Sequence, residues 1–427
     1  MDQIAVRETK DGVELAGLVH GLPDCPQPFR VWFRFSGLSA GQVECSGNPF
    51  VPALLGVAMW LRRPVEIESP VSPLLLEGAA RIMRIWHGWS RSMRPVEIRA
   101  GVLSEQYTQG REAACLFTGG VDSFHTLTEN LATETGSARV THLLFLGGQT
   151  DMALGNDALY RARCGVISEI AEELQLGVIF GATNVRDILP GWTLEWGVRA
   201  GSNVVAPSLC LSPLLDRVFT SASFTYDAPF PWGCHPFTDP LWNTARIRFE
   251  HRGCEVARDG KVIQSICRSA TALRYLKVCN DGEATGYNCG RCEKCLRTMI
   301  ALRAVGALDR CRTLPHEIPL DAVARLNACV PITRIFMVEN LDRLRRTGAD
   351  PRLEAALASA LKPNFWRRLI YILTEAAYRL DRALFQGNLR SRVIRQAKVC
   401  RSGPELRENP ARWLFARMRD LARAKKA

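Results

Sequence analysis

The sequence predicts an α/β fold in which a parallel sheet carries helices on both faces. In residues 111–308, apolar segments of strand length alternate with longer segments that have the apolar spacing of a helix. The first of these strands runs directly into TGGVDS, a polar segment with two glycines that precedes a helix. This order is typical of right-handed strand–helix–strand crossovers, which build parallel sheets.

The chain is long enough for several domains, and its composition changes along its length. Its 427 residues are 47% hydrophobic and 23% charged, which excludes a disordered or fibrous protein. We expect a small N-terminal α+β domain over residues 1–110, the α/β domain over 111–308, and a helical basic region over 309–427.

The N-terminal part is expected to combine short strands with one helix. The helix spans residues 72–89, with Ser72 as its N-cap and Pro73 at its first position. Strand-like segments occur at residues 29–35, 64–69 and 95–100. This part contains no chemical motif.

The central part is expected to supply four strands, at residues 112–117, 141–148, 176–182 and 217–224. Helical segments are expected at 158–174 and in the residues after Asn203. Ligands in parallel sheets bind at the carboxyl ends of the strands, so the loop after the first strand is the first candidate site.

The C-terminal part contains an amphipathic helix, residues 364–385, followed by a basic segment. We expect the apolar stripe of this helix to pack against the protein rather than to anchor it to a membrane. Residues 361–427 hold 17 Lys and Arg against 5 Asp and Glu, whereas residues 1–360 hold 38 of each. The net charge of +12 therefore belongs to this segment, which suits an acidic partner.

No apolar run reaches the roughly 18 residues of a membrane-spanning helix, and the N-terminus lacks the pattern of a secretory signal. We therefore expect a cytoplasmic protein with no membrane partner. In that reducing compartment the 15 cysteines should be buried thiols, metal ligands or reactive thiols.

The loop after the first strand has the composition of an anion-binding turn. Two glycines allow a tight backbone, and a helix N-terminus directs free backbone N–H groups at one point. We favour phosphate binding over a plain strand–turn–helix with an Asp cap. The segment resembles the SGGxDS loop of the PP-loop ATP pyrophosphatases, with Thr118 in place of Ser.

That resemblance implies an adenine nucleotide fold and an ATP-dependent reaction that forms an acyl-adenylate and releases pyrophosphate. Catalysis is assigned to Asp122 and Ser123, and Asp122 is expected to coordinate Mg²⁺ because its charge would otherwise repel phosphates. The expected ATP-binding residues are Leu116, Phe117, Thr118, Gly119, Gly120, Val121, Asp122 and Ser123.

Four cysteines predict a zinc site. Cys279, Cys289, Cys292 and Cys295 have the spacing C-x9-C-x2-C-x2-C, and four thiolates in a tetrahedron form a closed, structural site. Cys254 and Cys267 are the alternatives to Cys279 as the fourth ligand. Nearby Arg291, Lys294 and Arg297 are expected to offset the negative charge of the cluster.

Loop and cysteines together resemble the 7-cyano-7-deazaguanine synthases (QueC), over roughly residues 113–306. SASFTYDAPFPWGCHPF is similar to that family's segment at a strand end, and implies substrate roles for Asp227, Cys234 and His235. Asn203 matches a family Asn, whereas Ser202, Trp232, Gly233 and His235 depart from the family pattern. We expect His235 to line or cap a pocket. Arg163 is expected either to clamp a phosphate or carboxylate or to lie on a solvated helix face.

The resemblance implies adenylation of the carboxylate of 7-carboxy-7-deazaguanine and amide formation with an amine. The large flanking regions favour an amine on a partner protein, as in QueC-like proteins of type IV CBASS anti-phage operons. The alternatives are a synthase that uses ammonia in queuosine biosynthesis, a PP-loop enzyme that modifies tRNA, and a zinc-stabilised interaction protein without activity. The departures around Cys234 bear on the nitrile-forming step of the synthases.

Overall fold

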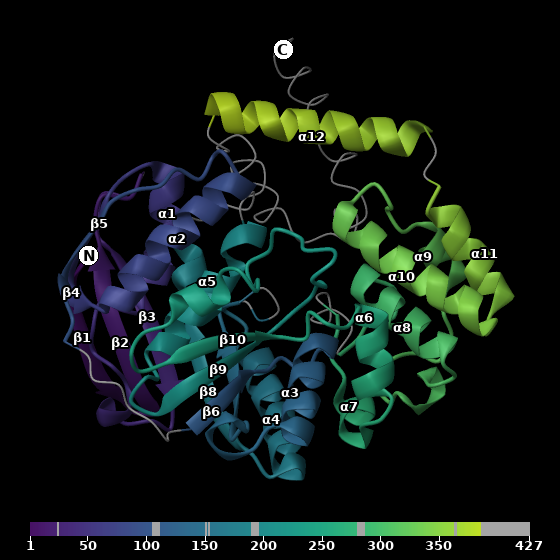
Figure 1. Cartoon of the computed structure of the whole chain (residues 1–427), viewed down its shortest axis with the longest axis horizontal. Coiled ribbons are helices and arrows are strands. Elements are labelled where there is room, and N and C mark those ends of the chain that lie inside the picture. The colour runs from purple at the N-terminus through teal and green to yellow at the C-terminus, as the bar shows by residue number, and fades with distance from the viewer. Residues whose placement is uncertain are drawn as a thin grey trace.

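The fold is described from a computed structural model of the chain (Figure 1). The structure describes residues 1–23, 25–104, 112–149, 152, 154–188, 196–279, 287–362 and 365–385. The predicted boundary at residue 110 and the C-terminal end of the basic segment lie outside these ranges. Within the described residues, no helix combines the length and apolarity needed to cross a bilayer.

A single eight-stranded sheet runs through the molecule, in the order β1-β2-β3-β8-β7-β6-β9-β10. Its last five strands are mutually parallel. They are β6 (Glu112–Leu116), β7 (His142–Gly147), β8 (Gly177–Thr183), β9 (Leu215–Ser221) and β10 (Arg248–Arg252). The α/β class expected from the sequence is therefore confirmed.

The order of the parallel strands reverses at β6. From β6 the chain moves outward to β7 and then β8, and it returns to the other side of β6 for β9 and β10. At such a reversal the loops on the two sides of the central strand diverge and leave a crevice at the carboxyl ends. The loop after β6 opens into that crevice.

Helices cover both faces of the parallel strands, as the sequence predicts. Ala114, Leu144 and Val218 face one apolar core, whereas their neighbours Cys115, Leu143 and Phe219 face the other. The first core is closed by α1 (Phe50–Leu61), α2 (Pro73–Trp89) and α5 (Trp196–Leu209). The second is closed by α3 (Val121–Thr133), α4 (Asp157–Leu174), α7 (Ala270–Tyr275) and α8 (Glu293–Ala304).

The N-terminal strands extend the same sheet. They are β1 (Asp2–Thr9), β2 (Gly12–Val19) and β3 (Phe29–Ser36), all antiparallel to their neighbours. β3 pairs with β8, where Phe33 lies opposite Thr183. A second, two-stranded parallel sheet joins β4 (Val65–Val71) to β5 (Ile98–Val102).

Three helices of the C-terminal region pack on α8. α9 (Leu320–Ala324), α10 (Pro331–Thr347) and α11 (Pro351–Ala360) share an apolar core with Leu296 and Ile300 of α8. α10 also reaches α6 (Arg258–Lys261), because Arg343 donates to Asp259 at 2.8 Å.

Two expectations about helices are wrong. α5 begins at Trp196, so Asn203 lies inside the helix rather than ahead of it. The apolar stripe of α12 (Phe365–Phe385) does not pack, because Phe365, Trp366 and Leu373 are more than half exposed. Figure 1 shows α12 at the periphery, as one long helix apart from the layers of the sheet.

Candidate functional site

The β6–α3 loop forms the wall of a polar cavity at the carboxyl end of β6. Phe117 is buried, Gly119 adopts a φ of 75° that favours glycine, and α3 begins at Val121 with Gly120 as its N-cap. The Ser123 hydroxyl donates to the Gly120 carbonyl at 3.1 Å. The first backbone N–H groups of α3, which have no partner within the helix, are therefore available at this wall.

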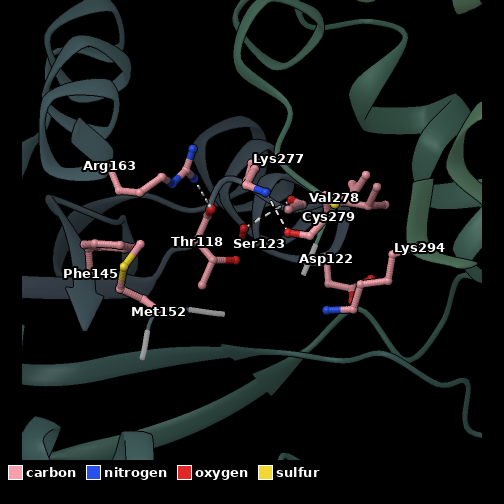
Figure 2. A pocket seen from close by; sticks show the side chains of 12 residues that line it. Thr118, Asp122, Ser123, Phe145, Met152, Arg163, Lys277, Val278, Cys279 and Lys294 are labelled. Carbon is pink, nitrogen blue, oxygen red and sulfur yellow. Dashed lines mark hydrogen bonds between the residues drawn. The ribbon is translucent and has the colours of Figure 1, made fainter. Parts of the chain in front are cut away.

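Three cations surround the loop (Figure 2). The polar cavity is lined by Thr118, Gly120, Val121, Asp122, Ser123, Phe145, Met152, Arg163, Lys277, Val278, Cys279 and Lys294. Arg163 approaches from α4, Lys277 from the segment before the cysteines, and Lys294 from the first turn of α8. Asp122 is the one acidic side chain among these lining residues, so the cavity suits an anion.

Arg163 belongs to the site and not to a solvated helix face. It is 5% exposed, and its Nη2 donates to the Thr118 carbonyl at 2.9 Å. Its guanidinium lies 5.0 Å from the centre of the Tyr287 ring. Its Nη1 is buried and has no hydrogen-bond partner in the described part of the chain. A buried guanidinium with one donor left over fits a ligand oxygen.

Lys277 joins the cysteine segment to the loop. Its backbone N–H donates to the Gly119 carbonyl at 2.8 Å, and its Nζ donates to the carbonyls of Cys279 and Tyr287, both at 2.6 Å. Folding of the cysteine segment therefore fixes one edge of the polar cavity.

Asp122 is held by cations of the protein itself. Its Oδ2 accepts from Arg258 at 2.6 Å and from Ser223 at 3.2 Å, and Lys261 Nζ lies 3.9 Å from Oδ1. Burial by itself raises the pKa of the Asp122 carboxyl, but Arg258, Lys261 and Arg297 lower it to about 2. Asp122 is thus an anion at neutral pH.

The fit of Asp122 to Mg²⁺ rests on one oxygen. Among the described residues, Oδ1 has no hydrogen-bond partner although it is buried. A carboxylate oxygen of this kind, at the wall of an anion site, suits a Mg²⁺ ion that also binds phosphates. Arg258 and Lys261 meanwhile offset the repulsion between the carboxylate and an anion.

A second, apolar cavity adjoins the polar one. It is lined by Leu116, Phe117, Thr118, Asp122, Ser123, Leu144, Phe145, Leu146, Gln149, Met152, Ala200, Val204, Thr220, Ser221 and Cys234. Thr118, Asp122, Ser123, Phe145 and Met152 line both cavities. One site thus has an anion-binding end and an apolar end, as a nucleotide or a planar heterocyclic acid requires.

Cys234 lines this apolar end, and Asn203 lies behind it, bonded to the lining residue Gln149. Asn203 is 1% exposed, its carbonyl accepts from Gln149 at 3.1 Å, and both polar atoms of its side chain lack partners in the described residues. Cys234 lines the apolar cavity, and burial raises the pKa of its thiol. A buried amide with unmet donors and acceptor suits a ligand that supplies them.

Two predicted substrate residues lie away from both cavities. Asp227 is exposed on the loop after β9. The His235 ring packs against Trp89 and Phe237, and its Nδ1 accepts from the Phe237 N–H at 3.1 Å. Burial lowers the pKa of His235. His235 therefore shapes its own turn.

The four predicted metal ligands converge. The sulfur atoms of Cys279, Cys289, Cys292 and Cys295 all lie within 4.8 Å of one another. Cys289 and Cys295 are 3.9 Å apart, and Cys279 and Cys292 are 3.8 Å apart. A tetrahedron with Zn–S distances of about 2.3 Å has edges of about 3.8 Å. The cluster therefore fits zinc, with Cys279 as a ligand in place of Cys254 or Cys267.

The cations next to the cysteines have separate tasks. Arg291 pairs with Asp321 at 2.8 Å, and Lys294 lines the polar cavity. Arg297 is buried beside Asp122, and burial lowers its pKa to about 10. From the sequence alone all three were expected around the metal, because residue spacing does not show in which direction each side chain points.

A comparison with protein-family models, curated proteins and solved structures finds no match. The interpretation of the site therefore rests on its own residues.

Arg258, Lys261 and Lys277 were not predicted as site residues. Arg258 and Lys261 follow Asp122 by more than 130 residues, and ARDGK has no recognisable spacing. The one available signal is that this segment follows β10 directly. It therefore starts at the carboxyl ends of the parallel strands, where the loop after β6 also lies.

Proposed function

We propose that the protein is an ATP-dependent ligase that adenylates the carboxylate of a 7-deazaguanine, 7-carboxy-7-deazaguanine, and forms an amide with an amine of a partner protein. The observation that carries this proposal is the polar cavity. A glycine-containing loop and a helix N-terminus face Arg163, Lys277 and Lys294 across it. These groups suit a pyrophosphate.

The order of the parallel strands is that of a doubly wound sheet, which binds nucleotides at the point where the order reverses. β8-β7-β6-β9-β10 corresponds to 3-2-1-4-5 when the strands are numbered along the chain from β6, and the loop follows the central strand. The resemblance of TGGVDS to the PP-loop motif and this topology are independent observations, since the first is local and the second is global.

The chemistry follows from the two ends of the site. A carboxylate oxygen attacks the α-phosphorus of ATP, the bond to the β-phosphate oxygen breaks, and pyrophosphate leaves. The cations of the polar cavity stabilise the charge that develops on pyrophosphate. The amine nitrogen then attacks the acyl carbon, AMP departs, and the nitrogen loses a proton. Mg²⁺, held by Asp122 and the phosphates, would add positive charge.

The apolar cavity is the proposed place for the deazaguanine. Its ring system is planar and apolar on its faces, and its edge carries donors and acceptors that suit the side-chain amide of Gln149. The zinc site supports the fold beside the polar cavity and takes no part in the reaction, because all four positions are thiolates.

The test is exchange of labelled pyrophosphate into ATP. We expect exchange only when 7-carboxy-7-deazaguanine is present, and at least a hundredfold lower exchange in Asp122→Asn. Asp309→Asn, an exposed carboxylate outside the site, is the matched control. Circular dichroism shows whether the variants are folded.

Mass spectrometry identifies the acceptor. A protein adduct formed with ATP, the carboxylate and a candidate partner supports conjugation. Free nitrile formed with ammonia favours the synthase, and AMP release that depends on tRNA favours an RNA-modifying enzyme. Folded wild-type protein with no exchange would refute the ligase.

A further inference from the structure

One side of α12 exposes large apolar side chains. Six large apolar side chains are 45–68% exposed, a condition that is unfavourable in water. They are Phe365, Trp366, Ile370, Ile372, Leu373 and Leu380.

These side chains form one continuous face. At about 100° per residue they spread over about 160° of the helix circumference. On the opposite side, Arg367, Tyr371 and Thr374 are partly buried, and Arg367 Nη1 donates to the Ala324 carbonyl at 3.3 Å. α12 therefore turns its polar side to the protein and most of its apolar side outward, although Leu369 within the apolar side is partly buried.

The charge of the adjoining sequence indicates what could cover this face. Residues 386–427, which follow α12 directly, contain 12 Lys and Arg against 3 Asp and Glu. A basic segment beside an apolar helix face combines the two attractions that hold peripheral proteins on anionic lipid.

The width of the face argues against a second copy of the chain. A seam between two helices uses a narrow stripe of apolar residues, whereas this face is broad. A planar lipid surface instead covers the whole length of the face, and Trp366 suits the boundary between apolar and polar layers.

We infer that α12 lies in the surface of an anionic membrane, with its apolar face in the acyl boundary. The helix rests on the membrane and does not cross it, in agreement with its charged residues. The inference is independent of the proposed ligase activity.

The test is co-sedimentation of the full chain with lipid vesicles. One set contains phosphatidylcholine alone, and in the other phosphatidylglycerol replaces part of it. We expect binding to the anionic vesicles, weakened by salt, and little binding to the neutral ones.

Substitutions at two neighbouring positions test the apolar and the polar side of α12 separately. Leu373→Glu places a charge on the apolar face, whereas Thr374→Glu places the same charge on the polar side. We expect Leu373→Glu to lower the partition coefficient about tenfold or more, and Thr374→Glu to lower it far less. Leu373→Glu should keep the wild-type melting temperature, because Leu373 is exposed, and the melting temperature of Thr374→Glu shows whether that variant is folded.

Three results would overturn the inference. Absence of wild-type binding to anionic vesicles excludes a membrane role. An equal loss in the two variants shows that charge alone attracts the protein. A dimer that Leu373→Glu converts to a monomer, as measured by analytical ultracentrifugation, assigns the face to a second copy.

Discussion

Two glycines fix the loop that carries Cys234. A Cβ atom on Gly233 would lie 2.2 Å from the backbone nitrogen of Gly201, and a Cβ on Gly201 would lie 1.9 Å from the Gly233 carbonyl oxygen. The loop thus rests directly on α5, with backbone against backbone. Gly233, one of the departures from the QueC pattern, has a structural reason here.

We predict that Gly233→Ala displaces this loop from α5. The expected cost is about 1–3 kcal/mol in the free energy of unfolding, together with weaker binding of the proposed substrate. Gly165→Ala, in α4, is the control because no atom lies within 4 Å of the added Cβ. Urea unfolding and isothermal titration measure the two effects. Equal stability of the two variants would show that the loop yields easily.

A buried ion pair lies at the far side of the same loop. Asp239 is fully buried, and His251 Nδ1 donates to its Oδ2 at 2.8 Å. Burial by itself lowers the pKa of His251, but Asp239 and Cys254 raise it to about 9. His251 is therefore protonated at neutral pH.

This pair predicts a loss of stability in alkali. Because the folded pKa is raised, the contribution of His251 is complete below about pH 6.5 and disappears as the pH rises through 9. A shift of this size corresponds to about 3 kcal/mol. Unfolding free energy measured from pH 6 to 10 should fall in the wild type and change much less in His251→Gln. His316→Gln, an exposed histidine, should follow the wild type; parallel curves for all three proteins would contradict the assignment.

At the scale of elements, the cysteine cluster and the polar cavity are mechanically linked. Lys277 lies two residues before Cys279, and Lys294 lies one residue before Cys295. Both lysines line the polar cavity. Zinc binding would therefore position two of the three cations that face the loop.

We predict that Cys292→Ser loses the metal and weakens ATP binding together. Loss of a structural zinc removes stabilising free energy and releases the segment that carries Lys277. Cys45→Ser, an exposed cysteine outside the cluster, should retain both properties. Metal content by mass spectrometry and nucleotide affinity by titration are the measurements. Wild-type affinity in a metal-free variant would show that the lysines are placed without zinc.

The elements that the sequence predicted well are those with local signals. The TGGVDS loop and the cysteine spacing are each contained in a few residues, so their geometry follows from short-range constraints. β10 escaped prediction because Arg248, Glu250 and Arg252 leave few apolar residues in a strand at the edge of the sheet. The apolar stripe of α12 was recognised, but periodicity alone does not say whether such a face is covered.

At the scale of the whole molecule, the three predicted parts are joined more closely than their sequences suggest. Phe336 of α10 stacks on Phe224 of the loop after β9. The Arg297 guanidinium lies 4.1 Å from the centre of the Phe336 ring. The positive charge of Arg297 in turn helps to lower the pKa of Asp122. Such long-range contacts depend on the tertiary arrangement and have no sequence signal.

The N-terminal part is joined to the parallel strands by a shared sheet and by partly buried hydrogen bonds. The Trp32 N–H donates to Asn184 Oδ1 at 2.9 Å, and Asn184 Nδ2 donates to the Arg30 carbonyl at 2.7 Å. Removing β3 would leave the backbone of β8 unpaired at a new sheet edge. It would also open the core between α1 and α5.

We therefore predict that a chain truncated to residues 112–427 does not fold as a stable monomer. Exposure of an apolar core and an unpaired edge strand favours aggregation. The full chain is the reference for this truncated chain. Size-exclusion chromatography and thermal unfolding compare the two. A monomeric 112–427 chain with a cooperative transition near that of the full chain would show that residues 1–110 are an independent domain. The core of the 112–427 chain would then need no support from β3.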